Sequence, residues 1–558
     1  MTTHLRAGMA ALAALLVVVL TACGGLPTTG PVNAGRPIDA DESNSDLVFL
    51  PDGPAKDATP QQIVEGFIAA GAGPRNTWEK AKEFLAPGTP WNPRASVIVY
   101  APGDLDLQAL TESEFVVSVT PTATVDASGA LSGEGGEIPL SFTLAQQGDG
   151  QWRITHAPDG IVIDRNRFTR VYGNYALQFF DPTWTYLVPD QRWFPRLYAA
   201  TSIAEALVDG GPSAWLDGAV STAFIDGARL ATTTVPQQSG IAAVSLQDGA
   251  RGLDQTVLDR MQTQLEVSLD AAGIAGVDML VDEQVLSAQS LPVRQTRIDS
   301  RPLVRTQDAF GFASAGGVEE IVGLSGAILQ VDASDIEVSA DRTAAAVRDV
   351  SGVVLSVSGD GVRTRVDTRA DLIAPSIDPA GFVWSVPRSA PAALAAFRAD
   401  GTRIDVASAW PGAAEVFAQR VSRDGTRIAA VVRDGDRYAL WVAGIQRGRD
   451  DDAPTALGER KIIAYLSGPT DALTWIDAST VAVITTVSGD PAMITQEIGG
   501  FSQVQSVPTG VTTVAGGTAS GGMRILDAAG ELYGQQGANW QLIASGVLVL
   551  AVQQGSPR

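Results

Sequence analysis

The stretch Val421-Ser422-Arg423-Asp424-Gly425, which leads into Ile428-Ala429-Ala430-Val431, decides the fold of the C-terminal part of this 558-residue chain. It places a polar turn directly before a β-strand of small apolar residues. The pattern recurs at 338–347, 377–384 and 474–484, and a fainter fifth copy lies at 510–527. Aligned on Asp341, Ala380, Asp424 and Asp477, the copies are spaced by about 40–50 residues, which is the period of a β-propeller blade.

Repeats of this length that are made of short strands favour a propeller, because one twisted sheet cannot bury both of its faces whereas a closed ring of sheets can. We therefore predict an all-β propeller over residues 308–558, with five to seven blades and six favoured. The apolar segment 542–552 is expected to be its closing strand. An irregular two-sheet β-sandwich is the alternative.

Two α+β domains are predicted before the propeller, over residues 60–170 and 175–290. In the first, Thr59-Pro60 is a helix start, and a second short helix carries Trp78. Strand-like runs follow at 96–100, 114–119, 138–144 and 151–154. Helices followed by a curved antiparallel sheet resemble the cone-shaped nuclear-transport-factor-like domains, which often enclose a pocket.

The second domain is expected to contain a strand at 185–189 that Pro189 closes, a helix at 197–208, and strands at 219–225, 241–246 and 277–281. Leu258, Met261, Leu265 and Leu269 share one face of a further helix. Leu187-Val188-Pro189 with Arg192, followed by Ala206-Leu207-Val208-Asp209-Gly210-Gly211-Pro212, resembles the GerMN domain of spore-germination and cell-envelope proteins. That resemblance implies no binding residue. Residues 291–307 are predicted to be a linker whose arginines dock onto the acidic neighbouring domains.

The N-terminus carries the features of a secretory signal peptide over residues 1–22. Arg6 precedes an apolar run, which ends in Leu20-Thr21-Ala22-Cys23 and resembles a bacterial lipobox. In such a motif the thiol is linked to diacylglycerol and cleavage makes Cys23 the new N-terminus. The alternative is an uncleaved transmembrane helix, but the run is short for a hydrocarbon core of about 30 Å. Residues 23–59, rich in Gly, Pro, Asp and Ser, are predicted to form a lipidated flexible tether.

Composition argues against several classes of function. With 39 Lys+Arg against 62 Asp+Glu, the chain has a net charge of -23 and is a poor nucleic-acid binder. One Cys and two His leave little for nucleophile or metal chemistry, and the P-loop, Ser-x-x-Lys and Gly-x-Ser-x-Gly motifs are missing. We therefore predict no enzyme and no catalytic, cofactor-binding or metal residue. His156 is expected at a strand end on the surface, and a two-carboxylate glycosidase stays open.

The order of lipobox, tether, GerMN-like domain and propeller resembles the LpqB family of actinobacterial lipoproteins over essentially the whole chain. The resemblance implies an anchor of diacylglyceryl and N-acyl groups on Cys23, at the extracytoplasmic face of the cell membrane. It also implies binding to the extracytoplasmic domain of an MtrB-type sensor histidine kinase, and modulation of two-component signalling in cell-envelope homeostasis. The alternatives are a cell-wall glycan-binding or hydrolytic envelope protein acting through the propeller face, and a carrier that holds a lipid or wall precursor in its first domain.

Overall fold

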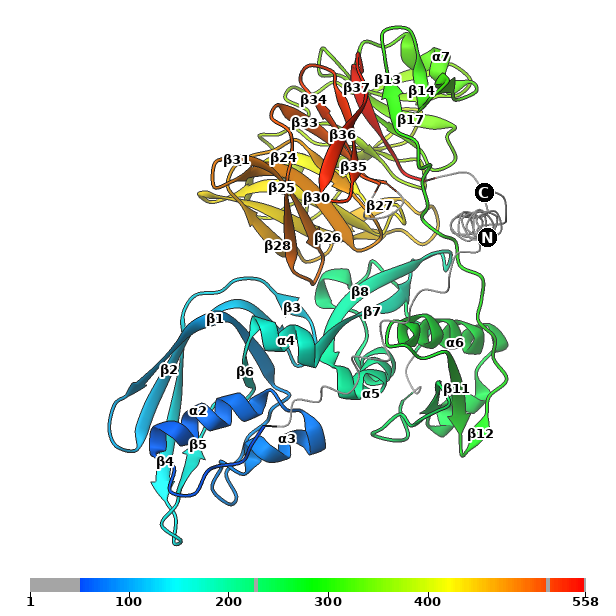
Figure 1. The fold of residues 1–558 in the computed structure, drawn as a ribbon. Coiled ribbons are helices and arrows are strands. Elements are labelled where there is room, and N and C mark those ends of the chain that lie inside the picture. The colour runs from blue at the N-terminus through cyan, green and yellow to red at the C-terminus, as the bar shows by residue number, and fades with distance from the viewer. Residues whose placement is uncertain (1–50, 225–228, 518–521, 556–558) are drawn as a thin grey trace, which may run out of the picture. The chain divides into compact units, whose positions relative to one another are not determined.

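The computed structural model describes residues 51–224, 229–517 and 522–555, so the predicted signal peptide and Cys23 lie outside the described residues. Residues 49–558 form one compact unit. By their elements we divide this unit into a first domain (α2 to α4), a second domain (β7 to β12) and a propeller (β13 to β37) (Figure 1). In the described part of the chain, no helix is both long and apolar enough to cross a membrane.

The first domain combines three helices with one mainly antiparallel sheet. Its helices are α2 (Pro60–Gly71), α3 (Arg75–Lys82) and α4 (Arg165–Val171). Its strands are β1 (Ser96–Ala109), β2 (Glu114–Asp126), β3 (Leu131–Ser132), β4 (Ile138–Gln146), β5 (Trp152–His156) and β6 (Ile161–Asp164), in the order β5-β4-β2-β1-β6 with β3 on β2. Thr59 and Gln62 form a capping box, which confirms the predicted helix start.

The structure corrects the predicted end of the tether at residue 59. The Asp57 backbone N–H donates to Gln151 Oε1 at 2.7 Å, and Gln151 Nε2 donates to Asp57 Oδ1 at 2.9 Å. Ala58 packs against the first-domain core. Residues 51–59 are therefore part of the first domain, because a strand-end glutamine and the apolar core both hold them.

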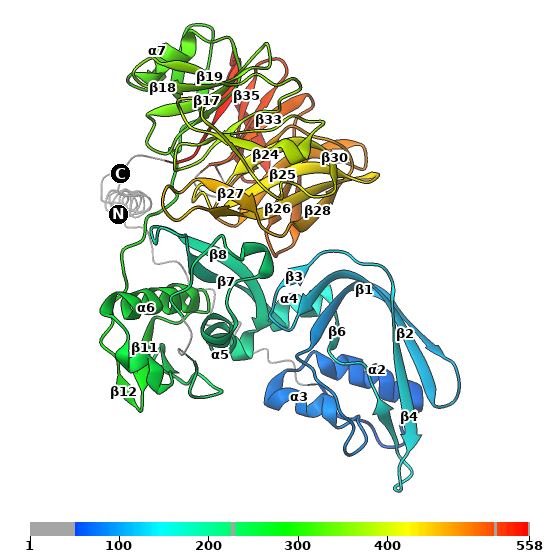
Figure 2. The ribbon, with the colours of Figure 1, turned by 180° about the vertical axis from the view of Figure 1, so that it is seen from behind.

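The second domain begins with a two-stranded ribbon and continues into a small sheet. Its strands are β7 (Tyr172–Phe180), β8 (Leu187–Pro195), β9 (Gln237–Gln238), β10 (Ile241–Ser245), β11 (Gly276–Val281) and β12 (Gln284–Val285). Its helices are η1 (Arg196–Tyr198), α5 (Ala199–Glu205), η2 (Ala206–Gly210), η3 (Ala214–Leu216), η4 (Asp248–Gly252) and α6 (Gln255–Asp270). The predicted Met–Leu stripe on α6 is buried. The helix contacts β7 and β11, and Figure 2 shows it next to β11.

Two predictions for this domain were wrong. Pro189 does not close a strand: it lies inside β8, opposite Gln178 of β7. A two-stranded ribbon has a free edge, where a missing N–H is tolerated. The segment predicted as a strand at 219–225 contributes an isolated bridge between Ser221 and Phe180, and residue 225 is outside the described chain.

In the described residues the propeller strands form five hydrogen-bonded sheets, the first of which has eight strands. In chain order, its first four groups of strands are β13 (Leu303–Arg305), β14 (Phe310–Ser314), β15 (Gly317–Glu320); β16 (Ala333–Val338), β17 (Ala344–Asp349), β18 (Val354–Ser358), β19 (Arg363–Asp367); β20 (Ser376–Ile377), β21 (Val383–Ser385), β22 (Ala395–Phe397), β23 (Arg403–Asp405); and β24 (Ala413–Val421), β25 (Arg427–Asp434), β26 (Arg437–Arg447), β27 (Pro454–Leu457), β28 (Lys461–Leu466). The next two groups are β29 (Leu473–Trp475), β30 (Thr480–Val487), β31 (Asp490–Glu497), β32 (Ser502–Ser506); and β33 (Val511–Ala515), β34 (Arg524–Asp527), β35 (Leu532–Gln536), β36 (Asn539–Ala544). The last strand, β37 (Val549–Gln553), joins the first two groups in one eight-stranded sheet. The short helices α7 (Leu324–Leu329) and η5 (Pro391–Ala393) connect strands.

The last strand of the chain closes the ring. β37 pairs antiparallel with β13, with Leu303 opposite Ala551, and parallel with β16, with Val338 opposite Gln553. The predicted closing segment 542–552 is therefore correct only from Val549, because residues up to Ala544 form the outer strand β36. The predicted linker 291–307 likewise ends earlier, since Leu303–Arg305 is the strand that β37 completes.

The repeated turn seen in the sequence is held by an aspartate carboxylate. Asp424 Oδ1 accepts from Ser422 Oγ at 2.7 Å and from the Thr426 backbone N–H at 2.9 Å. Asp341 Oδ1 accepts in the same way from Ser339 Oγ at 2.6 Å and from the Thr343 backbone N–H at 3.1 Å. In these two copies the turn is therefore a local unit, held within five consecutive residues.

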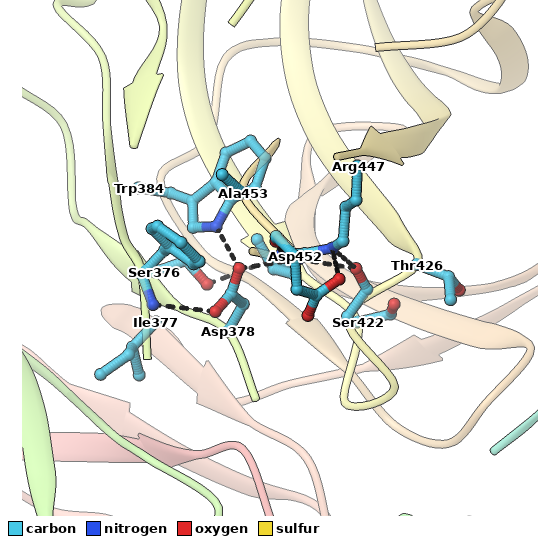
Figure 3. A network of polar contacts seen from close by, with 12 residues as sticks. Ser376, Ile377, Asp378, Trp384, Ser422, Thr426, Arg447, Asp452 and Ala453 are labelled. Atoms are coloured by element: carbon cyan, nitrogen blue, oxygen red, sulfur yellow. Dashed lines mark hydrogen bonds and ion pairs between the residues drawn. The ribbon is translucent and has the colours of Figure 1, made fainter. Parts of the chain in front are cut away.

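A buried ion pair joins two neighbouring blades (Figure 3). Asp378, in the turn after β20, accepts from Arg447 Nη2 at 2.7 Å and from Trp384 Nε1 at 2.9 Å on the same carboxylate oxygen. Arg447, at the end of β26, also donates to the carbonyl oxygens of Gly425 and Asp452. One arginine therefore ties the turn of one blade to two loops of the next.

Buried polar side chains from several inner strands meet within the propeller. Glu337 of β16 accepts from Ser376 Oγ of β20 at 2.7 Å and from Gln554 Nε2, and its other oxygen lies 3.5 Å from Arg420 Nε of β24. Burial raises the pKa of the Glu337 carboxyl, against the opposing effect of Arg420. One Glu337 oxygen is thus hydrogen-bonded by Ser376 and Gln554, whereas Glu337 Oε2 and Arg420 Nε are buried without a hydrogen-bond partner among the described residues.

Candidate binding site at the junction of the first two domains

The first two domains are joined by direct hydrogen bonds. The Trp193 backbone N–H of β8 donates to the Gly129 carbonyl in the β2–β3 turn at 2.7 Å. On the other side, Tyr198 Oη donates to the Pro74 carbonyl, just before α3, at 3.0 Å. Because these two contacts come from opposite ends of the Trp193–Tyr198 segment, the second domain lies across two separate loops of the first.

A buried arginine organises this junction. Arg192 Nη2 lies 2.7 Å from Asp190 Oδ2, and Arg192 Nη1 donates to the Ser128 carbonyl of the first domain at 2.8 Å. Arg192 Nη2 also reaches the Gly211 carbonyl at 3.2 Å, and Asp190 accepts from the backbone N–H and the hydroxyl of Ser213. The structure thus brings together two motifs that the sequence analysis singled out, Arg192 and Gly210-Gly211-Pro212. Their hydrogen bonds hold the junction of the two domains.

A cleft of about 540 Å³ opens beside this ion pair. Its walls come from both domains: the β2–β3 turn and Arg94 on one side, and β8, α5 and η2 on the other. A volume of this size at a domain junction is typical of ligand sites, which range from about 300 to 1,000 Å³. No pattern in the sequence predicted it, because the two walls come from different domains.

The lining of the cleft combines aromatic rings with acidic groups. The aromatic members are Trp78, Tyr172, Trp193, Phe194 and Tyr198, and the acidic members are Asp126, Glu205 and Asp209. The basic members are Arg94, which is exposed, and Arg192, whose charge Asp190 compensates. The cleft therefore offers apolar surface together with an excess of negative charge.

The propeller packs on the same junction through Phe501 and Gly499. Trp193 Nε1 donates to the Gly499 carbonyl at 2.8 Å. The Phe501 ring lies 5.5 Å from the Trp193 ring and 4.2 Å from the Arg165 guanidinium of α4. Lys461 of β28 also lies near Asp190, and burial lowers the pKa of its ammonium group. One turn of the propeller thus contacts elements of both preceding domains.

A second contact to the propeller is made by η3. Trp215 and Leu216 share a hydrophobic cluster with strands β24 to β31. Gly444 of β26 has no side chain to obstruct this approach: a Cβ there would lie 2.8 Å from the Trp215 carbonyl oxygen and 2.7 Å from Ala219 Cβ. The glycine permits close packing of the two backbones.

The interior of the first domain offers little room. The cavity between α2 and the sheet is about 20 Å³, and Phe67, Trp91 and Phe142 are among its lining residues. That is space for about one water molecule. The carrier alternative, in which this domain holds a lipid or wall precursor, finds no support here.

The other sequence predictions about sites concern His156 and metals. His156 ends β5 and is exposed, as expected. Over residues 51–224, 229–517 and 522–555, no three His, Cys, Asp or Glu side chains are grouped so that they could hold a metal ion. Cys23, the predicted lipid attachment residue, is outside these ranges.

Together, the two α+β domains and the closed ring of sheets define a multidomain β-propeller protein. Residues 53–169 match the family model described as "Lipoprotein LpqB, N-terminal domain", and residues 303–549 match "Lipoprotein LpqB beta-propeller domain". Residues 176–287 match the Germane model, described as "Sporulation and spore germination". The chain belongs to the LpqB lipoprotein family, and its GerMN-like domain is confirmed.

Relatives from several actinobacteria extend over nearly the whole chain. "Lipoprotein LpqB" of Rhodococcus opacus is 25% identical over 532 residues, covering 88% of this chain and 86% of the relative. The protein of the same name from Bifidobacterium longum is 26% identical over 603 residues, covering 96% and 97%. That of Streptomyces coelicolor is 26% identical over 554 residues, covering 89% of each. The family name implies lipid anchoring.

Proposed function

We propose that this lipoprotein binds the extracytoplasmic domain of an MtrB-type sensor histidine kinase and modulates two-component signalling in cell-envelope homeostasis. In this proposal the chain has no enzymatic activity of its own. It acts from the extracytoplasmic face of the cell membrane, where anchoring confines it to the same surface as the kinase and raises the effective concentration of the pair.

The observation that carries the proposal is the cleft beside Arg192. It is open, lies at a domain junction, and combines aromatic and acidic lining residues suited to a protein segment. Arg192 joins the first two domains around it, and the contacts at Phe501 and Trp215 connect its surroundings to the propeller. A partner held in the cleft would therefore influence the first domain, the second domain and the propeller.

The test is reconstitution of the full-length lipoprotein with the full-length kinase in one vesicle. We expect the lipoprotein to change the rate of kinase autophosphorylation and to co-purify with the kinase after detergent extraction. The control is the chain that lacks residues 549–558, in which β37 cannot close the propeller. An unchanged rate together with no co-purification would rule the proposal out.

We also propose that Cys23 carries the diacylglyceryl and N-acyl groups. The basis is the lipobox-like Leu20-Thr21-Ala22-Cys23 sequence and the family name. The Cys23→Ala variant is expected to accumulate as an uncleaved precursor that does not incorporate labelled palmitate. A variant processed to the normal mature size and still labelled would show that the anchor lies elsewhere.

A further inference from the structure

We infer that the cleft between the first two domains binds a cationic segment of a partner protein, one that presents arginine or lysine side chains. The identity of the partner as the kinase rests on the proposed function, whereas the chemistry of the ligand rests on the cleft itself. The inference follows from the charges of the lining, the hydrogen bonds that Arg192 already makes, and the aromatic surface.

The charged groups of the lining favour a cation. Asp126, Glu205 and Asp209 are all exposed, and against them stands the exposed Arg94. Among the described residues Glu205 makes no ion pair. Asp209 Oδ1 accepts a long hydrogen bond of 3.4 Å from the Leu230 backbone N–H and lies 3.8 Å from Arg229, which leaves its other oxygen for a ligand. In a half-enclosed cleft such charges attract a cation more strongly than they do in open solvent.

An anion is disfavoured because Arg192 is already engaged. Its Nε and Nη2 donate to Asp190, its Nη1 to the Ser128 carbonyl, and its Nη2 also to the Gly211 carbonyl. Donating to a bound anion would require it to give up contacts that join the two domains. Arg94 is the remaining arginine of the lining, and one exposed guanidinium is a weak anion site.

The aromatic surface suits the same ligand. A guanidinium or ammonium group is attracted to the face of an aromatic ring within about 6 Å of its centre. This chain uses that contact elsewhere, with the Arg260 guanidinium 3.8 Å from the Trp184 ring and that of Arg437 3.3 Å from the Tyr465 ring. Tyr198, at the end of η1 and hydrogen-bonded to Pro74 just before α3, is the half-buried aromatic of the lining and is the ring we expect a ligand to contact.

The test measures binding of defined peptides to the full-length protein in detergent by isothermal titration calorimetry. The probes are capped Gly-Arg-Gly-Arg-Gly, Gly-Gln-Gly-Gln-Gly and Gly-Glu-Gly-Glu-Gly. We expect the arginine peptide alone to bind, with an affinity that falls as salt is raised. The double variant Glu205→Gln/Asp209→Asn should weaken it by about ten-fold, since two charged contacts to the peptide are lost.

The matched control is Glu112→Gln/Glu134→Gln, which removes two exposed acids that do not line the cleft. It should bind the arginine peptide as the unmodified chain does. Equal binding of the glutamate peptide, or unchanged affinity in the cleft variant, would overturn the inference.

The two proposals can fail separately. If the kinase binds equally well to the unmodified chain and to Glu205→Gln/Asp209→Asn, the inference is wrong and the kinase-binding function stands. If the arginine peptide binds in the cleft but the kinase neither binds nor responds, the ligand chemistry stands and the proposed function is wrong.

Discussion

Arg192 Nη2 lies 2.7 Å from Asp190 Oδ2, with both side chains only 2% exposed. Replacing Asp190 by alanine leaves the arginine charge buried without its partner and also removes the acceptor for Ser213. We expect Asp190→Ala to lower the free energy of unfolding by about 3–5 kcal/mol, measured by urea denaturation. The exposed pair Arg251–Asp282 provides the control: Asp282→Ala should change it by less than about 1 kcal/mol. Similar losses in the two variants would contradict a structural role for Arg192.

The contact between Asp378 and Arg447 predicts strong coupling between two blades. Asp378 is fully buried and accepts from Arg447, from Trp384 and from the Phe382 backbone N–H. We expect Asp378→Ala to cost about 3–5 kcal/mol of stability and to expose the turn to limited proteolysis. Asp405→Ala, which breaks an exposed pair on the outer strand β23, should be nearly neutral. Equal protease resistance of both variants would show that the blades are held together by apolar packing alone.

Asp299 makes the junction before the propeller sensitive to acid. Hydrogen bonds from Arg301 lower the pKa of its carboxyl to about 2, from an ordinary value of 3.8. Because the folded pKa is depressed, the ion pair stabilises the protein above pH 4, and this contribution is lost as the pH falls from about 4 to 2. Asp299→Asn should therefore be less stable than the unmodified chain at neutral pH, by on the order of 1 kcal/mol. Unfolding free energies measured across pH 2–7 should converge at the acid end, and a constant difference would refute this assignment.

The pairing of β37 with β13 predicts that the C-terminus is essential for the propeller. Deleting residues 549–558 removes the inner strand of one blade and uncovers the apolar residues that Val549 and Ala551 pack against. We expect the truncated chain to bind a hydrophobic dye and to lose the cooperative unfolding of the propeller. Deleting only residues 556–558, beyond the last described residue, is the control and should leave unfolding unchanged. A truncated chain that unfolds cooperatively would mean that the ring closes without its last strand.

The propeller could be predicted because its repeated turns are local. Asp341 and Asp424 each hold a turn through hydrogen bonds to residues within two positions, so Ser, Asp and Thr recur at the same spacing in both copies. The helix that carries Met261 could also be predicted, because its apolar residues are spaced to lie on one helical face. Where β37 begins could not be predicted, since β36 and β37 are both apolar and only pairing with β13 distinguishes them.

The candidate site shows the limit of the same reasoning. Arg192 stood out as part of a motif, but the Ser128 carbonyl that it binds is 64 positions away, in another domain. A backbone carbonyl leaves no mark in the sequence, because every residue has one. The prediction that Pro189 ends a strand was wrong for a related reason. A proline is tolerated inside a strand whose edge is free, and the pairing of that strand with its neighbour decides which edge is free.

The position of β37 also determines the order in which the protein can assemble. Leu303 and Ala551 are adjacent in space but about 250 residues apart, so the ring stays open until the last segment of the chain is available. The two preceding domains contain only their own strands in their sheets and can form while the rest of the chain is still emerging. A chain truncated before β37 would consequently have two folded N-terminal domains and an open, protease-sensitive propeller. The ring of sheets therefore closes only in a chain that contains its last strand.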